Sequence, residues 1–128
     1  SFTGVTQALL DNGFELHSVM VEPEGCDTRT GQFIDHRLEG MAVGVPPPFL
    51  DWSLVGEVRR ISLHDMLDTQ RWLYLRSGIY VGNTAAATLA VGRLLHKEPC
   101  YAGWTIVTLA YDSGLWYQDL VNSGQQAA

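Results

Sequence analysis

Short apolar runs that resemble strands alternate with helical patterns along this sequence, and the alternation constrains the fold more than any other feature. Strands are predicted at residues 16–23, 57–62, 79–82 and 105–111. Helices are predicted at residues 1–13, 62–78 and 84–97, with a last helical turn or two at 113–123. Apolar strands separated by helices are typical of a largely parallel sheet that helices flank on both faces. We therefore expect an α/β fold.

Capping signals mark the ends of two of these helices. The helix at 62–78 is the clearest, with Ser62 as its N-cap, Asp65 at the capping-box position and Gly78 after its last turn. For the first helix, Ser1 or Thr3 is predicted to supply a side-chain cap.

A long segment at residues 23–56 is rich in glycine and proline and has no regular periodicity. A stretch of this length inside a domain is usually a functional loop or a disordered one. Its "GVPPPF" run is interpreted either as a stiff loop at the mouth of a site or as a proline-rich ligand for an aromatic groove.

Composition narrows the class of protein. The chain has 128 residues, enough for one domain with a real core, and a formal net charge of -6. The only basic cluster is the pair Arg59–Arg60, which argues against nucleic acid as a partner. No apolar run approaches the roughly 18 residues that a membrane helix needs. Cys26 and Cys100 form no CxxC pair and the histidines lack ligand spacing, so we expect a cytoplasmic protein without a metal site.

Polar residues follow predicted strands at points where a helix begins. Gly82 to Thr84 follow one strand, Asp112 to Gly114 follow another, and Ser1 opens the first helix. Ligands of parallel sheets gather at such junctions, and helix starts suit phosphate or carboxylate. Small residues after Thr84 would let a ligand or another protein segment approach. The alternative is that Thr84 is only a helix cap and Asp112–Ser113 only a turn.

Short motifs along the chain resemble those of one enzyme family, in its order and at its spacing. They are "SFTG" at 1–4, "VEP" at 21–23, "EGMAVG" at 39–44, "YVGNTAAA" at 80–87 and "YDSGLWY" at 111–117. With these five motifs, the sequence resembles the carboxyl-terminal half of fold-type-II pyridoxal-phosphate enzymes, most closely the cysteine synthase and cystathionine β-synthase family. The resemblance runs from Ser1 to about residue 121. It implies that residues 1–128 form the carboxyl-terminal part of the large, cofactor-binding domain.

The resemblance also implies roles for particular residues. Thr84 would pair with the pyridine nitrogen of pyridoxal 5'-phosphate, and its neutral hydroxyl suits loss and replacement of a β-substituent. Ser1 would close the phosphate loop at a helix start. The remaining cofactor-side positions are Gly82, Asp112 and Ser113, and the substrate-side positions are Gly40, Met41 and Ala42.

Three departures from the family pattern bear on which amino acid is bound. Ala42 stands where the family has a glycine, Asn83 replaces an apolar residue, and Tyr111 stands where proline is usual.

A pyridoxal-phosphate enzyme needs a buried Schiff-base lysine, and this chain has none that fits. Its only lysine, Lys97, follows a helix end, where a surface position is expected. The family carries the catalytic lysine in its amino-terminal half. The resemblance therefore implies β-replacement or β-elimination on a serine-like amino acid, inactive without that half and dimeric when complete. The alternative is a non-catalytic partner or regulatory subunit that retains the fold.

Overall fold

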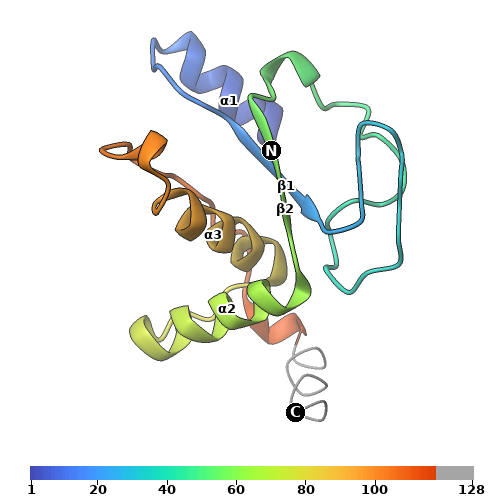
Figure 1. Cartoon of the computed structure of the whole chain (residues 1–128), viewed down its shortest axis with the longest axis vertical. Coiled ribbons are helices and arrows are strands. Elements are labelled where there is room, and N and C mark those ends of the chain that lie inside the picture. The colour runs from blue at the N-terminus through green and yellow to red at the C-terminus, as the bar shows by residue number, and fades with distance from the viewer. Residues whose placement is uncertain (118–128) are drawn as a thin grey trace.

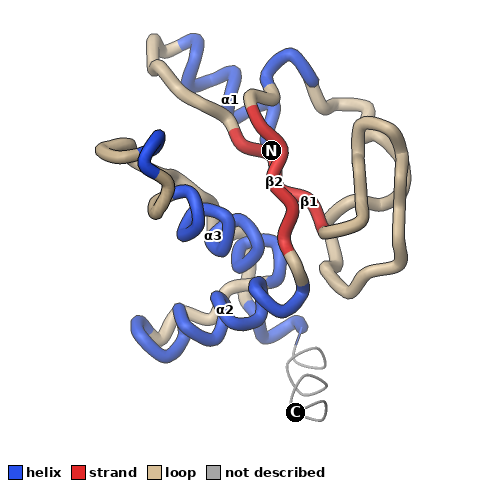
Figure 2. Tube along the Cα trace, viewed as in Figure 1, coloured by secondary structure: helices blue, strands red, loops and turns tan. Residues whose placement is uncertain are grey.

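The computed structural model describes residues 1–117, which form three α-helices and a pair of strands, with the core between the strands, α2 and α3 (Figure 1). Figure 2 shows how helix, strand and loop are distributed along the same trace. The elements are α1 (Phe2–Asp11), β1 (Val19–Pro23), η1 (Trp52–Leu54), β2 (Glu57–Ile61), α2 (Leu63–Ser77), α3 (Asn83–Leu95), η2 (Pro99–Tyr101) and η3 (Gly114–Tyr117).

The two strands are parallel, as the sequence predicts. Val19 pairs with Glu57 at one end of the register and Pro23 with Ile61 at the other. α2 and α3 pack against each other, and α3 also contacts both strands. The expected α/β fold with a parallel sheet is therefore confirmed, although the sheet has two strands among the described residues.

Small side chains let α3 pack closely on its neighbours. Ala86 and Ala87 are fully buried, and Ala85 is 3% exposed. With so little bulk on its first turns, the α3 backbone can approach other elements closely. The core cluster around it consists of Leu38, Met41, Ile61, Met66, Val81, Ala90, Val91 and Leu95.

The predicted ends of α2 are confirmed in detail. Ser62 Oγ accepts a hydrogen bond from the Asp65 amide at 3.0 Å and donates one to Asp65 Oδ2 at 2.7 Å. Gly78 ends the helix in the left-handed region, at φ 71°.

The predicted side-chain cap of α1 is wrong. Ser1 occupies the cap position, but its side chain makes no capping hydrogen bond. Thr3 lies inside the helix, and its hydroxyl donates instead to the Phe49 carbonyl at 2.9 Å. The hydroxyl therefore fastens the long loop to α1 rather than capping the helix.

The predicted strand at 79–82 is wrong, because this segment makes only one isolated antiparallel bridge, between Val81 and Ser113. The strand at 105–111 is also wrong. That segment is exposed and runs along α3, where Thr108 Oγ1 donates to Thr88 Oγ1 at 2.6 Å. It has no hydrogen-bonded strand beside it within residues 1–117. Of the helix predicted at 113–123, the described part contains η3, and residues 118–123 lie outside the described residues.

The long segment after β1 is a loop. Part of it extends from the strands away from α2 and α3 (Figure 1), whereas Leu38 and Met41 pack in the core beside α3. Glu22, at the end of β1, pairs with Arg60 at 2.8 Å and accepts the Thr28 amide at 2.9 Å. The Arg29 guanidinium lies over the Trp52 ring, 4.7 Å from its centroid. Among the described helices, none has the length and apolar character to cross a membrane.

Candidate active site

Two segments that precede α3 and η3 lie against each other. The Gly82 amide donates to the Asp112 carbonyl at 2.9 Å, and the Gly114 amide donates to the Tyr80 carbonyl at 3.0 Å. A Cβ at Gly82 would lie 1.9 Å from Asp112 Oδ1, so any other residue there would displace the Asp112 side chain. The structure thus brings Gly82, Asp112 and, through its bridge to Val81, Ser113 together.

A tyrosine hydroxyl completes this junction. Tyr117 donates to Asp112 Oδ2 at 2.9 Å. This hydrogen bond to a carboxylate is the main reason that the pKa of Tyr117 is raised, with burial and the negative charges of Asp112 and Glu39 adding to it. Tyr117 therefore keeps its proton and fixes the orientation of Asp112.

Thr84 faces the loop that carries Gly40. A Cβ built on Gly40 would lie 3.4 Å from Thr84 Oγ1. Gly40 has φ 83°, a left-handed conformation that glycine adopts at little cost. Gly82 is the N-cap of α3, and Thr84 lies one residue inside the helix, so its hydroxyl is not the helix cap. Of the two interpretations of Thr84, the structure excludes the helix cap.

The other two substrate-side positions differ in their surroundings. Met41 is 7% exposed and its side chain belongs to the core cluster, so this side chain is not available to a ligand. Ala42 is the one described non-glycine residue at positive φ, 35°, where the family pattern has glycine.

Ser1 and Lys97 make no hydrogen bond with these residues in the described part of the chain. Ser1 is exposed at the start of α1, and no hydrogen bond within the described chain joins it to the residues around Thr84. Lys97 is exposed just after α3, as expected from the sequence. Within residues 1–117, no group of histidine, cysteine or acidic side chains is arranged to hold a metal ion.

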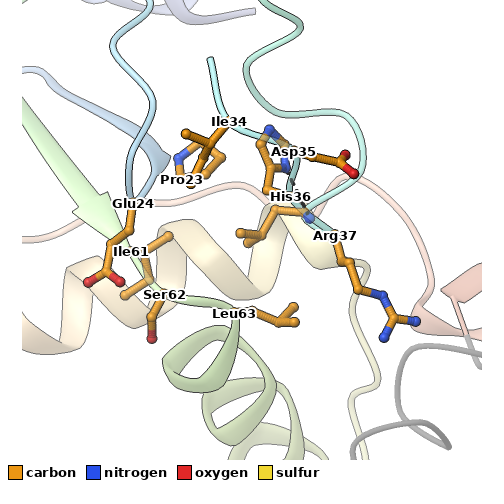
Figure 3. Close-up of a pocket in the computed structure, with 10 residues that line it drawn as sticks. Pro23, Glu24, Ile34, Asp35, His36, Arg37, Ile61, Ser62 and Leu63 are labelled. Atoms are coloured by element: carbon orange, nitrogen blue, oxygen red, sulfur yellow. Dashed lines mark hydrogen bonds between the residues drawn. The ribbon is translucent and has the colours of Figure 1, made fainter. Parts of the chain in front are cut away.

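An open hollow of about 310 Å³ lies at the carboxyl ends of β1 and β2 (Figure 3). In Figure 3 the loop residues His36 and Arg37 lie across it from Ser62 and Leu63. None of the predicted site residues lines it. Ligands of parallel sheets gather at the carboxyl ends of the strands, and a hollow does lie there. The residues that the family motifs indicate lie elsewhere, most of them around Thr84.

Three polar residues near the candidate site were missed or undervalued in the sequence. His36 bonds the backbone of the loop that carries Gly40, Tyr117 bonds Asp112, and Asn83 is 1% exposed with neither amide atom paired in the described structure. Their nearness to the family motifs was the available signal, because each lies inside or beside one of them.

The residues around Thr84 suit a flat cofactor with a ring nitrogen. The Thr84 hydroxyl lies in the first turn of α3, is partly exposed and does not cap the helix. It faces the backbone of Gly40, which has no side chain, and small residues follow Thr84. The Thr84 hydroxyl can offer a ring nitrogen a neutral hydrogen-bonding group.

Comparison with known proteins shows the family of this chain. The family model for the pyridoxal-phosphate dependent enzymes matches residues 1–112. A cysteine synthase of Haemophilus influenzae is 32% identical over 117 residues, which are 85% of this chain and 37% of that protein. An O-ureido-L-serine synthase of Streptomyces lavendulae is 29% identical over 118 residues, 91% of this chain and 36% of that one.

Solved structures give the same result. A cysteine synthase from Entamoeba histolytica superposes with a TM-score of 0.86 at 25% identity, covering 94% of this chain and 37% of that one. A variant O-ureido-L-serine synthase superposes with a TM-score of 0.84 at 27% identity, covering 94% and 38%.

The fold is an α/β domain of the kind found in solved cysteine synthases. The chain belongs to the pyridoxal-phosphate dependent enzyme family, and it is similar to cysteine synthases. The family's cofactor is pyridoxal phosphate, as the sequence predicts. The chain spans a little over a third of the length of the curated relatives it matches.

Proposed function

We propose that this chain is the carboxyl-terminal part of the large cofactor-binding domain of an enzyme that replaces or eliminates the β-substituent of a serine-like amino acid. The observation that carries the proposal is the approach of Gly40 to the Thr84 hydroxyl, 3.4 Å from the position of a Cβ. The relatives support the substrate class, because cysteine and O-ureido-L-serine both carry their substituent on the β-carbon.

Each predicted residue would have a distinct part in binding the cofactor. The Thr84 hydroxyl would pair with the pyridine nitrogen, and the free amide groups at the start of α1, beside Ser1, would bind the phosphate. Gly82, with the Asp112–Ser113 turn against it, would hold the α3 start in place. When bound, pyridoxal phosphate supplies an electron sink for chemistry at the α- and β-carbons.

The type of side chain at position 84 would tune this reaction. A neutral hydroxyl does not hold a proton on the ring nitrogen as a carboxylate would. The electron demand of the ring then stays moderate, which favours β-chemistry over transamination. The backbone of Gly40 to Ala42 would border the amino-acid side of the ring.

The reaction would also need a lysine that this chain does not offer, because Lys97 is exposed beyond the end of α3. We assign that lysine and most of the phosphate loop to an amino-terminal half, on the same or a separate chain. This chain together with that half is called the assembled protein. A cytoplasmic homodimer is the proposed state of the complete enzyme.

Substitution of Thr84 in the assembled protein tests the proposal. Thr84→Ser keeps the hydroxyl, so the cofactor absorption spectrum and turnover should stay close to wild type. Thr84→Ala should weaken cofactor binding by about 1–3 kcal/mol, because the ring nitrogen loses its partner in a partly buried site. Thr84→Asp should protonate the ring, shift the absorption and slow β-chemistry.

Thr88→Ala is the matched control. Thr88 lies one turn further along α3, and its hydroxyl donates to the Ala85 carbonyl at 3.0 Å. Its loss should leave the cofactor spectrum unchanged. An assembled protein that binds no pyridoxal phosphate would instead favour a non-catalytic partner.

A further inference from the structure

The imidazole of His36 spans the loop that carries the substrate-side positions. His36 Nε2 lies 3.0 Å from the Ala42 carbonyl oxygen, and His36 Nδ1 lies 3.2 Å from the Leu38 amide. The Phe33 ring packs beside the imidazole, with 5.4 Å between centroids. One side chain thus links both ends of a short loop, residues 36–42.

Only one form of the imidazole satisfies both contacts. The Leu38 amide is a donor, so Nδ1 must be the acceptor and carry no proton. The Ala42 carbonyl is an acceptor, so Nε2 must carry the proton and donate it. The two contacts therefore fix the neutral tautomer with the proton on Nε2.

The linked loop has an unusual backbone between its ends. Gly40 has φ 83° and Ala42 has φ 35°, and the Met41 amide donates to the Leu38 carbonyl at 3.2 Å. A left-handed conformation is costly for alanine, so the surrounding contacts must maintain it. His36 donates to the carbonyl of that same residue.

This constraint reaches Thr84 through the backbone. Gly40 lies inside the loop that His36 closes, and its open side faces Thr84 Oγ1. A rigid loop would hold the backbone of Gly40 to Ala42 at a fixed distance from that hydroxyl. A loose loop would let the substrate side of the site widen.

We propose that His36, as its Nε2-protonated tautomer, is a positioning residue that holds the loop 36–42 against Thr84 and so shapes the amino-acid side of the site. The proposal rests on the proposed function, since it assigns the bound amino acid to that side. His36 acts through the backbone and does not touch substrate.

The first test reads the tautomer directly, without activity. In the assembled protein labelled with ¹⁵N-histidine, the His36 resonances should show an unprotonated Nδ1 and a protonated Nε2. The Leu38 amide should also exchange with solvent more slowly than in His36→Ala. A proton on Nδ1 would overturn the proposal.

The second test uses two substitutions that each keep one contact. The Asn side chain places its acceptor near the Nδ1 position and cannot reach Ala42, whereas Gln can place its amide donor near the Nε2 position. His36→Asn should therefore weaken binding of O-acetyl-L-serine about two- to tenfold, the range for one lost hydrogen bond. His36→Gln should change it by less than about twofold.

Binding is measured from the change in the cofactor absorption spectrum as O-acetyl-L-serine is added. His64→Asn is the control, because His64 is exposed on α2. Equal effects of Asn and Gln at position 36, or none, would overturn the proposal. A wild-type protein without bound cofactor would contradict the proposed function, whereas a normal cofactor spectrum with the wrong tautomer would contradict this proposal alone.

Discussion

The backbone of Gly82 lies against the side chain of Asp112, so closely that a Cβ at position 82 would overlap the carboxylate. The Gly82 amide donates to the Asp112 carbonyl at 2.9 Å, and a Cβ would lie 1.9 Å from Asp112 Oδ1. Asp112 Oδ2 in turn accepts the Tyr117 hydroxyl. A methyl group at position 82 would therefore displace the Asp112 carboxylate and disturb its hydrogen bond with Tyr117.

We predict that Gly82→Ala lowers the pKa of Tyr117 toward its ordinary value of 10.0, because the hydrogen bond to Asp112 is the main cause of its elevation. The pKa is measured from tyrosinate absorbance, with the Tyr117→Phe titration subtracted. Gly4→Ala is the control, since a Cβ at Gly4 meets nothing within 4 Å. An unchanged titration in Gly82→Ala would contradict the proposed contact.

The acid side of the stability profile should depend on Glu57. Tyr101 donates to Glu57 Oε2 at 2.6 Å, Arg59 also pairs with this carboxylate, and His17 lies 3.4 Å away. The Tyr101 hydrogen bond is the largest cause of the lowered pKa of Glu57. A lowered pKa in the folded state favours the ionised form, so its contribution is present above the ordinary value of 4.5 and is lost as pH falls through the folded pKa.

We predict that Tyr101→Phe flattens the loss of unfolding free energy between about pH 6 and about pH 3. Urea unfolding of the assembled protein at a series of pH values measures this slope. Tyr74→Phe is the control, because Tyr74 is 52% exposed on α2. If both variants keep the wild-type slope, Glu57 is not stabilised by Tyr101 in solution.

Local signals predict the helices well, because the residues that end a helix are its own neighbours. Ser62, Asp65 and Gly78 act on the backbone within one turn of their positions. The predictions of strands at 79–82 and 105–111 were wrong because a strand needs a partner from elsewhere in the chain. The apolar alternation of 105–111 carries no information about whether that partner is beside it.

In the candidate site too, contacts between residues distant in sequence are not predicted by local signals. Gly40 and Thr84 are far apart in sequence, and only the family resemblance linked them before the structure placed them together. The roles of His36 and Tyr117 depend on which carbonyl or carboxylate lies opposite them. Residue type and spacing do not give that information, since both side chains are common on ordinary surfaces.

The 128-residue chain on its own should self-associate. Large apolar side chains are exposed, including Phe49 at 90%, Trp116 at 80% and Val107 at 78%. Extensive exposed apolar surface marks a face that another chain segment covers, or one that aggregates. We expect light scattering to show oligomers or aggregates, which an amino-terminal half should convert into a defined species. A monomeric chain with a cooperative thermal transition would argue against the split-enzyme proposal.

A comparison of Gly40 with Gly78 separates the effect of backbone strain from that of crowding at the Thr84 hydroxyl. Gly40 and Gly78 both have left-handed conformations, at φ 83° and 71°. A Cβ at Gly78 meets nothing within 4 Å, whereas one at Gly40 lies 3.4 Å from Thr84 Oγ1. Gly40→Ala and Gly78→Ala should therefore both lower the unfolding free energy, each by about 1–2 kcal/mol.

Only Gly40→Ala should weaken pyridoxal-phosphate binding, by about two- to tenfold, because its methyl group occupies space beside the hydroxyl that would pair with the ring. Absorbance titration of the assembled protein with the cofactor measures both affinities. Gly78→Ala should bind as wild type does. Equal losses in the two variants would mean that reduced stability, and not the space between Gly40 and Thr84, controls binding, and Thr84 would then lose its proposed place at the cofactor ring.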